Sequence, residues 1–94
     1  MIKQRHLSMV EERYLKVIEG GGVNPILPKD MYFRVMLEEG GKTGEKIAQT
    51  MVGRIRKKLG EESIVNRRGF GYLTQENYQK GLERIWKLSS VEKE

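Results

Sequence analysis

The sequence contains no cysteine and a single histidine, His6. Without cysteine there is no disulfide framework, no thiolate nucleophile and no zinc ribbon. One histidine cannot build a multi-histidine metal site, and no Ser-His-Asp or Cys-His set can be assembled. The acidic residues are scattered along the chain and do not indicate a catalytic pair of carboxylates. We therefore expect no enzyme activity, no metal site and no cofactor.

Long hydrophobic runs are also missing. The sequence has no apolar run of about 18 residues, the length that indicates a membrane-spanning helix. Its first six residues, MIKQRH, open no apolar signal-peptide core. We expect a protein that is neither secreted nor embedded in a membrane. With 94 residues, 37% hydrophobic and 33% charged, the chain is typical of one globular domain with a modest core, and we assign residues 1–94 to it.

Basic residues are concentrated in one third of the chain. The whole sequence has 18 Lys+Arg and 13 Asp+Glu, a net charge of +5. Residues 42–72 hold the entire excess, since the rest of the chain has equal numbers of both signs. The basic residues of this segment are Lys42, Lys46, Arg54, Arg56, Lys57, Lys58, Arg67 and Arg68. Such clustering indicates a nucleic-acid-binding surface, although a solvated face without a partner has the same composition.

Hydrophobic periodicity and punctuating residues predict three helices, at residues 8–19, 28–38 and 45–59. Ser8 is expected to cap the first, and the fixed φ of Pro28 suits the start of the second. The glycine-rich segment 40–44 is predicted to be a loop in which Thr43 caps the third helix. The expected apolar side of the second helix is Met31, Phe33, Val35, Met36 and Leu37. That of the third is Ala48, Met51, Val52, Ile55 and Leu59.

A hairpin and a further helix are expected after the third helix. Residues 63–67 and 71–74 predict two short strands around a glycine-containing turn. Phe70 and Tyr72 are expected to pack against the hairpin and the core. The domain core would thus span about residues 7–74, followed by an extension over about 75–90. Residues 75–88 of this extension predict an amphipathic helix.

The basic segment resembles the end of an OmpR/PhoB-type winged helix-turn-helix domain. Residues 53–60, GRIRKKLG, are similar to the end of the family's recognition helix. Residues 67–72, RRGFGY, resemble its R-G-x-G-Y wing. Upstream, Leu7, Ser8 and Glu11 resemble the opening of its first helix, and residues 26–30 the start of its second. The resemblance covers about residues 7–74; the family's N-terminal sheet and its receiver domain have no counterpart in it.

This resemblance implies an α+β fold: three helices, a C-terminal β-hairpin wing and, here, an additional C-terminal helix. It also implies sequence-specific binding of double-stranded DNA by a stand-alone transcriptional regulator located in the cytoplasm, at the nucleoid. The helix at 45–59 would enter the major groove, and the wing at 63–74 would lie at the minor groove.

Residue chemistry assigns roles within this arrangement. Arg54 can pair with guanine O6 and N7 together, and Gln49 and Thr50 can bond to other base edges. The remaining candidates would contact phosphates, which set the register of the protein on the duplex, or the minor groove, whose negative potential increases where the groove is narrow. The full set of candidate DNA-binding residues is Lys46, Gln49, Thr50, Arg54, Arg56, Lys57, Lys58, Arg67 and Arg68. Gly53, in mid-helix, is either a point of close approach to DNA or the wing, or a neutral surface position.

Other functions remain open from the sequence. A winged helix can bind a protein, such as RNA polymerase or another regulator, instead of DNA. The segment Arg68–Tyr72 also matches the start of the RNP1 signature of RNA-recognition motifs, although the signature's last aromatic is replaced by Gln75. Finally, a stripe in the last helix would pack on the core or, alternatively, form a homodimer interface. This stripe consists of Tyr78, Leu82, Ile85 and Trp86.

Overall fold

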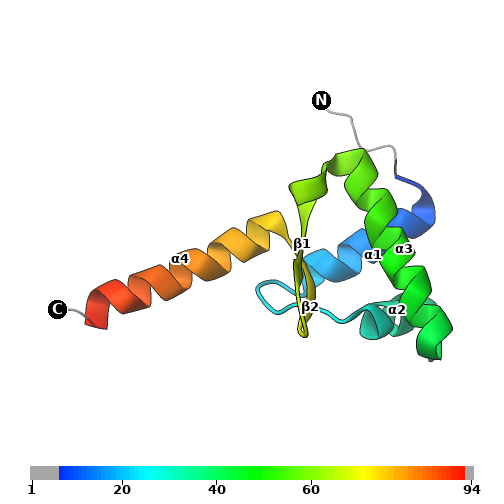
Figure 1. The fold of residues 1–94 in the computed structure, drawn as a ribbon, viewed down its shortest axis with the longest axis horizontal. Helices are drawn as coiled ribbons and strands as arrows, with labels where there is room; N and C mark the ends of the chain where they lie inside the picture. Colours follow the sequence, from blue (N-terminus) through cyan, green and yellow to red (C-terminus); the bar gives the residue numbers. More distant parts are fainter. Residues whose placement is uncertain (1–6, 93–94) are drawn as a thin grey trace.

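The computed structural model describes residues 7–92, with the side chains of residues 7–85. Its elements are α1 (Met9–Gly20), α2 (Pro28–Met36), α3 (Gly41–Leu59), a 3₁₀ turn (Glu61–Ser63), β1 (Ile64–Arg67), β2 (Gly71–Thr74) and α4 (Gln75–Glu92). In Figure 1 the first three helices pack together, the hairpin lies beside them, and α4 runs away from this body. The described chain is therefore α+β, in the element order expected from the sequence and compatible with a winged helix.

The core lies where the three helices meet the base of the hairpin. Helix α1 contributes Leu15 and Ile18, and α3 contributes the fully buried Ala48, Val52 and Ile55. These α3 residues are part of the apolar side expected from the sequence, and Met51 and Leu59 pack at its margin. The remaining buried apolar side chains are Tyr14, Ile26, Met31, Tyr32, Ile64, Tyr72 and Leu73.

Helix α1 begins at the expected cap. Ser8 Oγ accepts a hydrogen bond from the amide of Glu11 at 3.2 Å, and Glu11 Oε1 accepts one from the amide of Ser8 at 2.9 Å. This reciprocal capping box satisfies two amides that have no partner within the helix. It also fixes the Glu11 side chain, which is 3% exposed, against the end of α3.

The predicted start of α3 is wrong by four residues. The helix begins at Gly41 with Gly40 as its N-cap, so residues 41–44 form its first turn and Thr43 is not the cap. The cause is the Tyr32 ring, which packs directly on this turn. A Cβ at Gly44 would lie 2.7 Å from Cδ1 of Tyr32, and a Cβ at Gly40 would also meet the ring. Glycine has poor helix propensity, but here it makes room for a core tyrosine, and this packing outweighs propensity.

The predicted apolar side of α2 is also largely wrong. Met31 is buried, but Phe33, Met36 and Leu37 are 48%, 47% and 81% exposed. The helix ends at Met36, earlier than expected, because Leu37 adopts a left-handed conformation with φ 61°. Tyr32, which was not among the predicted core residues, is buried at 8% exposure.

The hairpin is anchored at its base. Its strands pair antiparallel from Ile64–Thr74 to Arg67–Gly71, as expected, while Ser63 belongs to the 3₁₀ turn. On its other edge β2 pairs with Ile26, through Ile26 N to Tyr72 O at 2.9 Å and Tyr72 N to Ile26 O at 2.8 Å. Gly71, at φ 121°, leaves no room for a Cβ beside the backbone of Ile26. Strand β2 is thus hydrogen-bonded on both edges, to β1 and to Ile26.

Two expectations of packing are not met. Phe70 is 63% exposed at the tip of the hairpin, although its neighbour Tyr72 is buried as expected. In α4, Leu82 and Ile85 are 43% and 63% exposed, so this part of the stripe does not pack on the core. Tyr78 is half-buried. The fourth residue of the stripe, Trp86, lies outside the residues whose side chains are described.

Candidate nucleic-acid interface

The polar face of α3 is exposed along its whole length. Successive residues of a helix are turned by about 100°, so Lys42, Lys46, Gly53 and Lys57 lie within about 60° of one another. Gln49 and Thr50 flank this line. All six positions are exposed, whereas Ala48, Val52 and Ile55 on the opposite side are buried. The partition of α3 into an inner apolar and an outer basic face is therefore as predicted.

Lys42 was not among the candidate residues. It was assigned to a loop because the sequence placed the helix start at residue 45. With α3 beginning at Gly41, Lys42 lies one turn before Lys46 on the same exposed line. The available signal was the four-residue spacing of Lys42 and Lys46, which places both on one side of a helix, but the glycines around them indicated a loop.

Arg54 lies at one edge of this face. It follows Lys46 by eight residues, which turns it by about 80° toward α1. Its positive charge contributes to lowering the pKa of the Glu11 carboxyl in α1. Arg54 is nevertheless exposed, and its guanidinium makes no hydrogen bond or ion pair within residues 7–85.

Arg56 does not belong to the exposed face. Its Nε and Nη2 both donate to the carbonyl oxygen of Ile64, at 3.0 and 2.6 Å, and its guanidinium lies 5.9 Å from the centre of the Tyr72 ring. The side chain is half-buried between α3 and the wing. The guanidinium fork thus joins the helix to β1. The contact of Arg56 with phosphate stays a prediction.

Lys58 has a similar structural role at the other side of α3. Its Nζ lies 2.8 Å from Oε1 of the buried Glu11. This hydrogen bond, followed by that from the Ser8 amide, holds the pKa of the Glu11 carboxyl below its usual value. Lys58 therefore neutralises a buried carboxylate and ties the end of α3 to the start of α1, while its side chain is still 40% exposed and its contact with phosphate stays a prediction.

The two arginines of the wing differ in their contacts with the rest of the protein. The Arg67 guanidinium lies 5.7 Å from the centre of the Phe70 ring and 6.0 Å from that of Tyr78, within the range of cation–π contacts. Arg68, at the turn, is exposed and has no partner in the described part of the chain. Neither Glu61 nor Glu62 forms an ion pair with it, so Arg68 does not serve to steady the hairpin.

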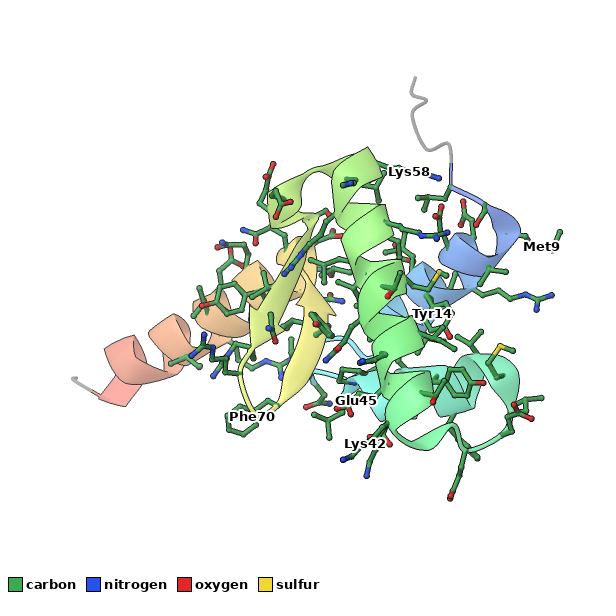
Figure 2. All side chains as sticks on the ribbon, turned by 45° about the vertical axis from the view of Figure 1, so that its right-hand side comes forward. Met9, Tyr14, Lys42, Glu45, Lys58 and Phe70 are labelled. Carbon is green, nitrogen blue, oxygen red and sulfur yellow. The ribbon has the colours of Figure 1, made fainter. Side chains whose placement is uncertain are left out.

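The wing and α3 present their tips at the same end of the molecule. In Figure 1 the turn of the hairpin and the first turn of α3 both lie at the lower edge, and Figure 2, from another side, shows Phe70, Lys42 and Glu45 there. The half-buried Glu45 is the one acidic residue of the first two turns of α3. Both views therefore place the basic hairpin tip and the basic start of α3 at the same end of the molecule.

The RNP1-like segment lacks the geometry of an RNA-binding sheet. In that motif, exposed strand aromatics stack on bases. Here Tyr72 is 9% exposed and faces the core, and only Phe70 is accessible. The hairpin also has two strands and one bridge rather than a four-stranded sheet.

The described residues hold neither a candidate membrane span nor a candidate metal site. No helix combines the length and low polarity needed to cross a bilayer. No group of three or more His, Cys, Asp or Glu side chains within this range could hold a metal ion. Comparison with known proteins identifies no relative: no family model, curated protein or solved structure matches the chain.

Proposed function

We propose that this protein binds double-stranded DNA sequence-specifically and regulates transcription, with α3 in the major groove and the wing, residues 63–74, at the adjacent minor groove. The observation that carries the proposal is the exposed basic line on α3, Lys42, Lys46 and Lys57, beside a wing whose Arg68 has no partner within the described residues. A helix of this kind fits a major groove about 12 Å wide. A regulator of this type would act in the cytoplasm, at the nucleoid.

The two parts of the interface have different tasks. Gln49, Thr50 and Arg54 carry the donors and acceptors that distinguish base edges. Lys42, Lys46 and Lys57 would contact phosphates, which fix the position of the helix without reading sequence. Arg68 would approach the minor groove, where negative potential increases as the groove narrows.

A salt titration of duplex binding tests the proposal. Within residues 42–72, five exposed basic side chains make no hydrogen bond, ion pair or aromatic-ring contact with another described residue: Lys42, Lys46, Arg54, Lys57 and Arg68. Five neutralised phosphates give a slope of log K against log salt of about −4 to −5. Selection from a random DNA pool would supply the site, and a gel shift with excess non-specific competitor would establish specificity. A slope near zero, or no duplex binding at low salt, would contradict the proposal.

A second candidate function is binding to a protein, such as RNA polymerase or another regulator. The observation that favours it is an exposed apolar patch at the end of α2, formed by Phe33, Met36 and Leu37 and followed by the exposed Glu38 and Glu39. Exposed apolar patches next to polar residues are typical of protein interfaces. In this case Leu37→Ser would abolish capture of the partner, while substitutions of Lys46 and Lys57 would leave it unchanged.

A further inference from the structure

The tip of the wing carries an aromatic ring that the fold itself does not use. Phe70 is 63% exposed, whereas the next residues of β2, Gly71, Tyr72 and Leu73, are buried. The amide of Phe70 donates to the carbonyl oxygen of Arg67 at 2.8 Å, which closes the turn. Gly69 and Gly71 on either side have φ of 82° and 121°. The backbone therefore determines where the ring stands, without any need for burial.

One side of the ring is backed by a cation. The Arg67 guanidinium lies near the Phe70 ring, and the same guanidinium lies near the Tyr78 ring of α4. Arg67 is thus held by two aromatic side chains from two elements. A ring supported in this way loses little conformational freedom when it binds, because its neighbour and its backbone are already fixed.

The charge around the ring identifies the kind of partner. Residues 63–75 contain no acidic residue, while Arg67 ends β1 just before the turn and Arg68 lies in the turn. A surface that combines cations with an exposed flat apolar ring matches a polyanion whose interior consists of stacked bases. Proteins that lie in the minor groove use such rings as wedges, which partly unstack a base step and bend the duplex.

We propose that Phe70 is a wedge that inserts from the minor groove at a base step beneath the wing. This inference rests on the proposed binding of duplex DNA and adds a specificity-determining residue to it. Arg68 supplies attraction to the groove, and Phe70 opens the step. Because pyrimidine–purine steps such as TA are the easiest to unstack, the wing selects a deformable step beyond the bases that α3 reads.

The test uses the full chain and a duplex taken from random-pool selection, with 2-aminopurine placed in turn at each position of the wing flank. For the wild-type protein we expect a several-fold rise in 2-aminopurine fluorescence at one step. We also expect affinity to be several-fold higher when that step is TA than when it lies in an A-tract. Phe70→Ala should lose the fluorescence change, the bend and the preference for TA, and bind about tenfold more weakly. Phe70→Leu, which keeps an apolar wedge, should retain most of each signal.

Two control variants distinguish loss of the Phe70 wedge from loss of another exposed ring and from loss of positive charge. Phe33→Ala removes the other exposed phenylalanine, which lies on α2 and is 48% exposed, and should change none of these signals. Arg68→Ala should lower affinity while the fluorescence change at saturation persists, because the ring is still present. Since Phe70 is exposed, its substitution should leave the melting temperature nearly unchanged. A lower melting temperature of the variant would show that the substitution disturbs the fold.

The outcomes distinguish the wedge from DNA binding itself. If Phe70→Ala binds, bends and discriminates as the wild type does, the wedge is excluded and the proposed function stands. If the wild-type protein binds single-stranded RNA rather than duplex DNA, or binds no duplex, both proposals are wrong.

Discussion

Lys57 and Lys58 are adjacent in the sequence, but their side chains contact different surroundings. Lys57 is exposed on the basic face of α3, whereas Lys58 bonds to the buried Glu11. We expect Lys57→Ala to leave the melting temperature unchanged, to weaken binding to all duplexes alike and to reduce the salt slope by about one unit. Lys58→Ala should instead destabilise the fold by about 1–3 kcal/mol, because it leaves a buried carboxylate with one bond fewer.

Thermal melts and salt titrations of the two variants provide the measurement. Each protein serves as the control for the other, since both lose one lysine from the same helical turn. Equal melting temperatures, or an equal change of salt slope, would mean that the two lysines have the same role.

The buried carboxyl of Glu11 makes stability depend on pH. Its pKa is lowered in the folded protein, first by the hydrogen bond from Lys58 and then by that from the Ser8 amide. A lowered folded-state pKa means that the stabilisation is complete above the unfolded value of about 4.5 and is lost as pH falls through the folded value. We expect Glu11→Gln, which keeps a cap acceptor but no charge, to melt at a lower temperature near neutral pH and to show a smaller decrease below pH 4.5. A wild-type melting temperature that rises on acidification would contradict this linkage.

At the scale of elements, local patterns in the sequence predicted most of the fold. The cap at Ser8, the proline start of α2, the buried side of α3 and the paired strands all follow from spacings of a few residues, and the structure has each of them. The errors arise where contacts between residues distant in the sequence determine the position of a side chain. Lys58 meets Glu11 across 47 positions, and Arg56 meets Ile64 across eight. A count of charges cannot separate these two cations from Lys46 or Lys57.

The start of α3 shows the same limit. Glycine-rich sequence normally indicates a loop, and only the Tyr32 ring, packed against Gly40 and Gly44, shows why glycines occupy a helical turn. The exposed Phe70 is the opposite case, because an aromatic residue in a hairpin is normally expected to pack. In both, the deciding information is the space around a residue, which a single sequence does not contain.

In α3, replacement of glycine by alanine is expected to change the stability of the protein in opposite directions at two positions, Gly53 and Gly44. At Gly53 a Cβ would meet no atom within 4 Å, so Gly53→Ala should stabilise the free protein by about 0.5–1 kcal/mol through helix propensity. At Gly44 a Cβ would lie 2.7 Å from the Tyr32 ring, so Gly44→Ala should destabilise it by about 1–3 kcal/mol. Chemical denaturation of both variants measures the difference. If Gly44→Ala is neutral or stabilising, residues 41–44 do not pack on Tyr32 as described.

Gly53 also reports on how closely α3 approaches DNA. It lies at the middle of the exposed basic line, and nothing in the described structure requires a glycine there. A Cβ at this position would not meet the wing, so close approach to the wing is excluded, and close approach to DNA and a neutral surface position remain. Weaker DNA binding by the more stable Gly53→Ala would show that the helix approaches the groove at this residue.

At the scale of the whole molecule, α4 gives the chain an elongated shape. The radius of gyration is 14.8 Å, compared with about 12 Å for a compact domain of this length. Beyond its first turns α4 extends away from the body (Figure 1) and leaves Leu82 and Ile85 exposed. These side chains continue into a groove that is also lined by Val23, Leu73 and Tyr78. The apolar surface of α4 is therefore continuous with the base of the wing.

We propose that this surface pairs two copies of the chain, the alternative that the sequence offered to core packing. A two-fold dimer through α4 would place two α3 helices on one duplex, and half-sites would then be separated by about one helical turn of DNA, 34–36 Å, or a multiple of it. Sedimentation equilibrium should detect a dimer of the wild-type protein. The double variant Leu82→Glu with Ile85→Glu should be monomeric and should bind a single half-site with unchanged affinity but the paired site more weakly. Lys80→Glu is the control, because it changes the net charge by the same two units on the opposite side of α4. A wild-type protein that remains monomeric at all concentrations, and selected DNA sites without a second half, would show that α4 does not join two copies and that each α3 acts alone.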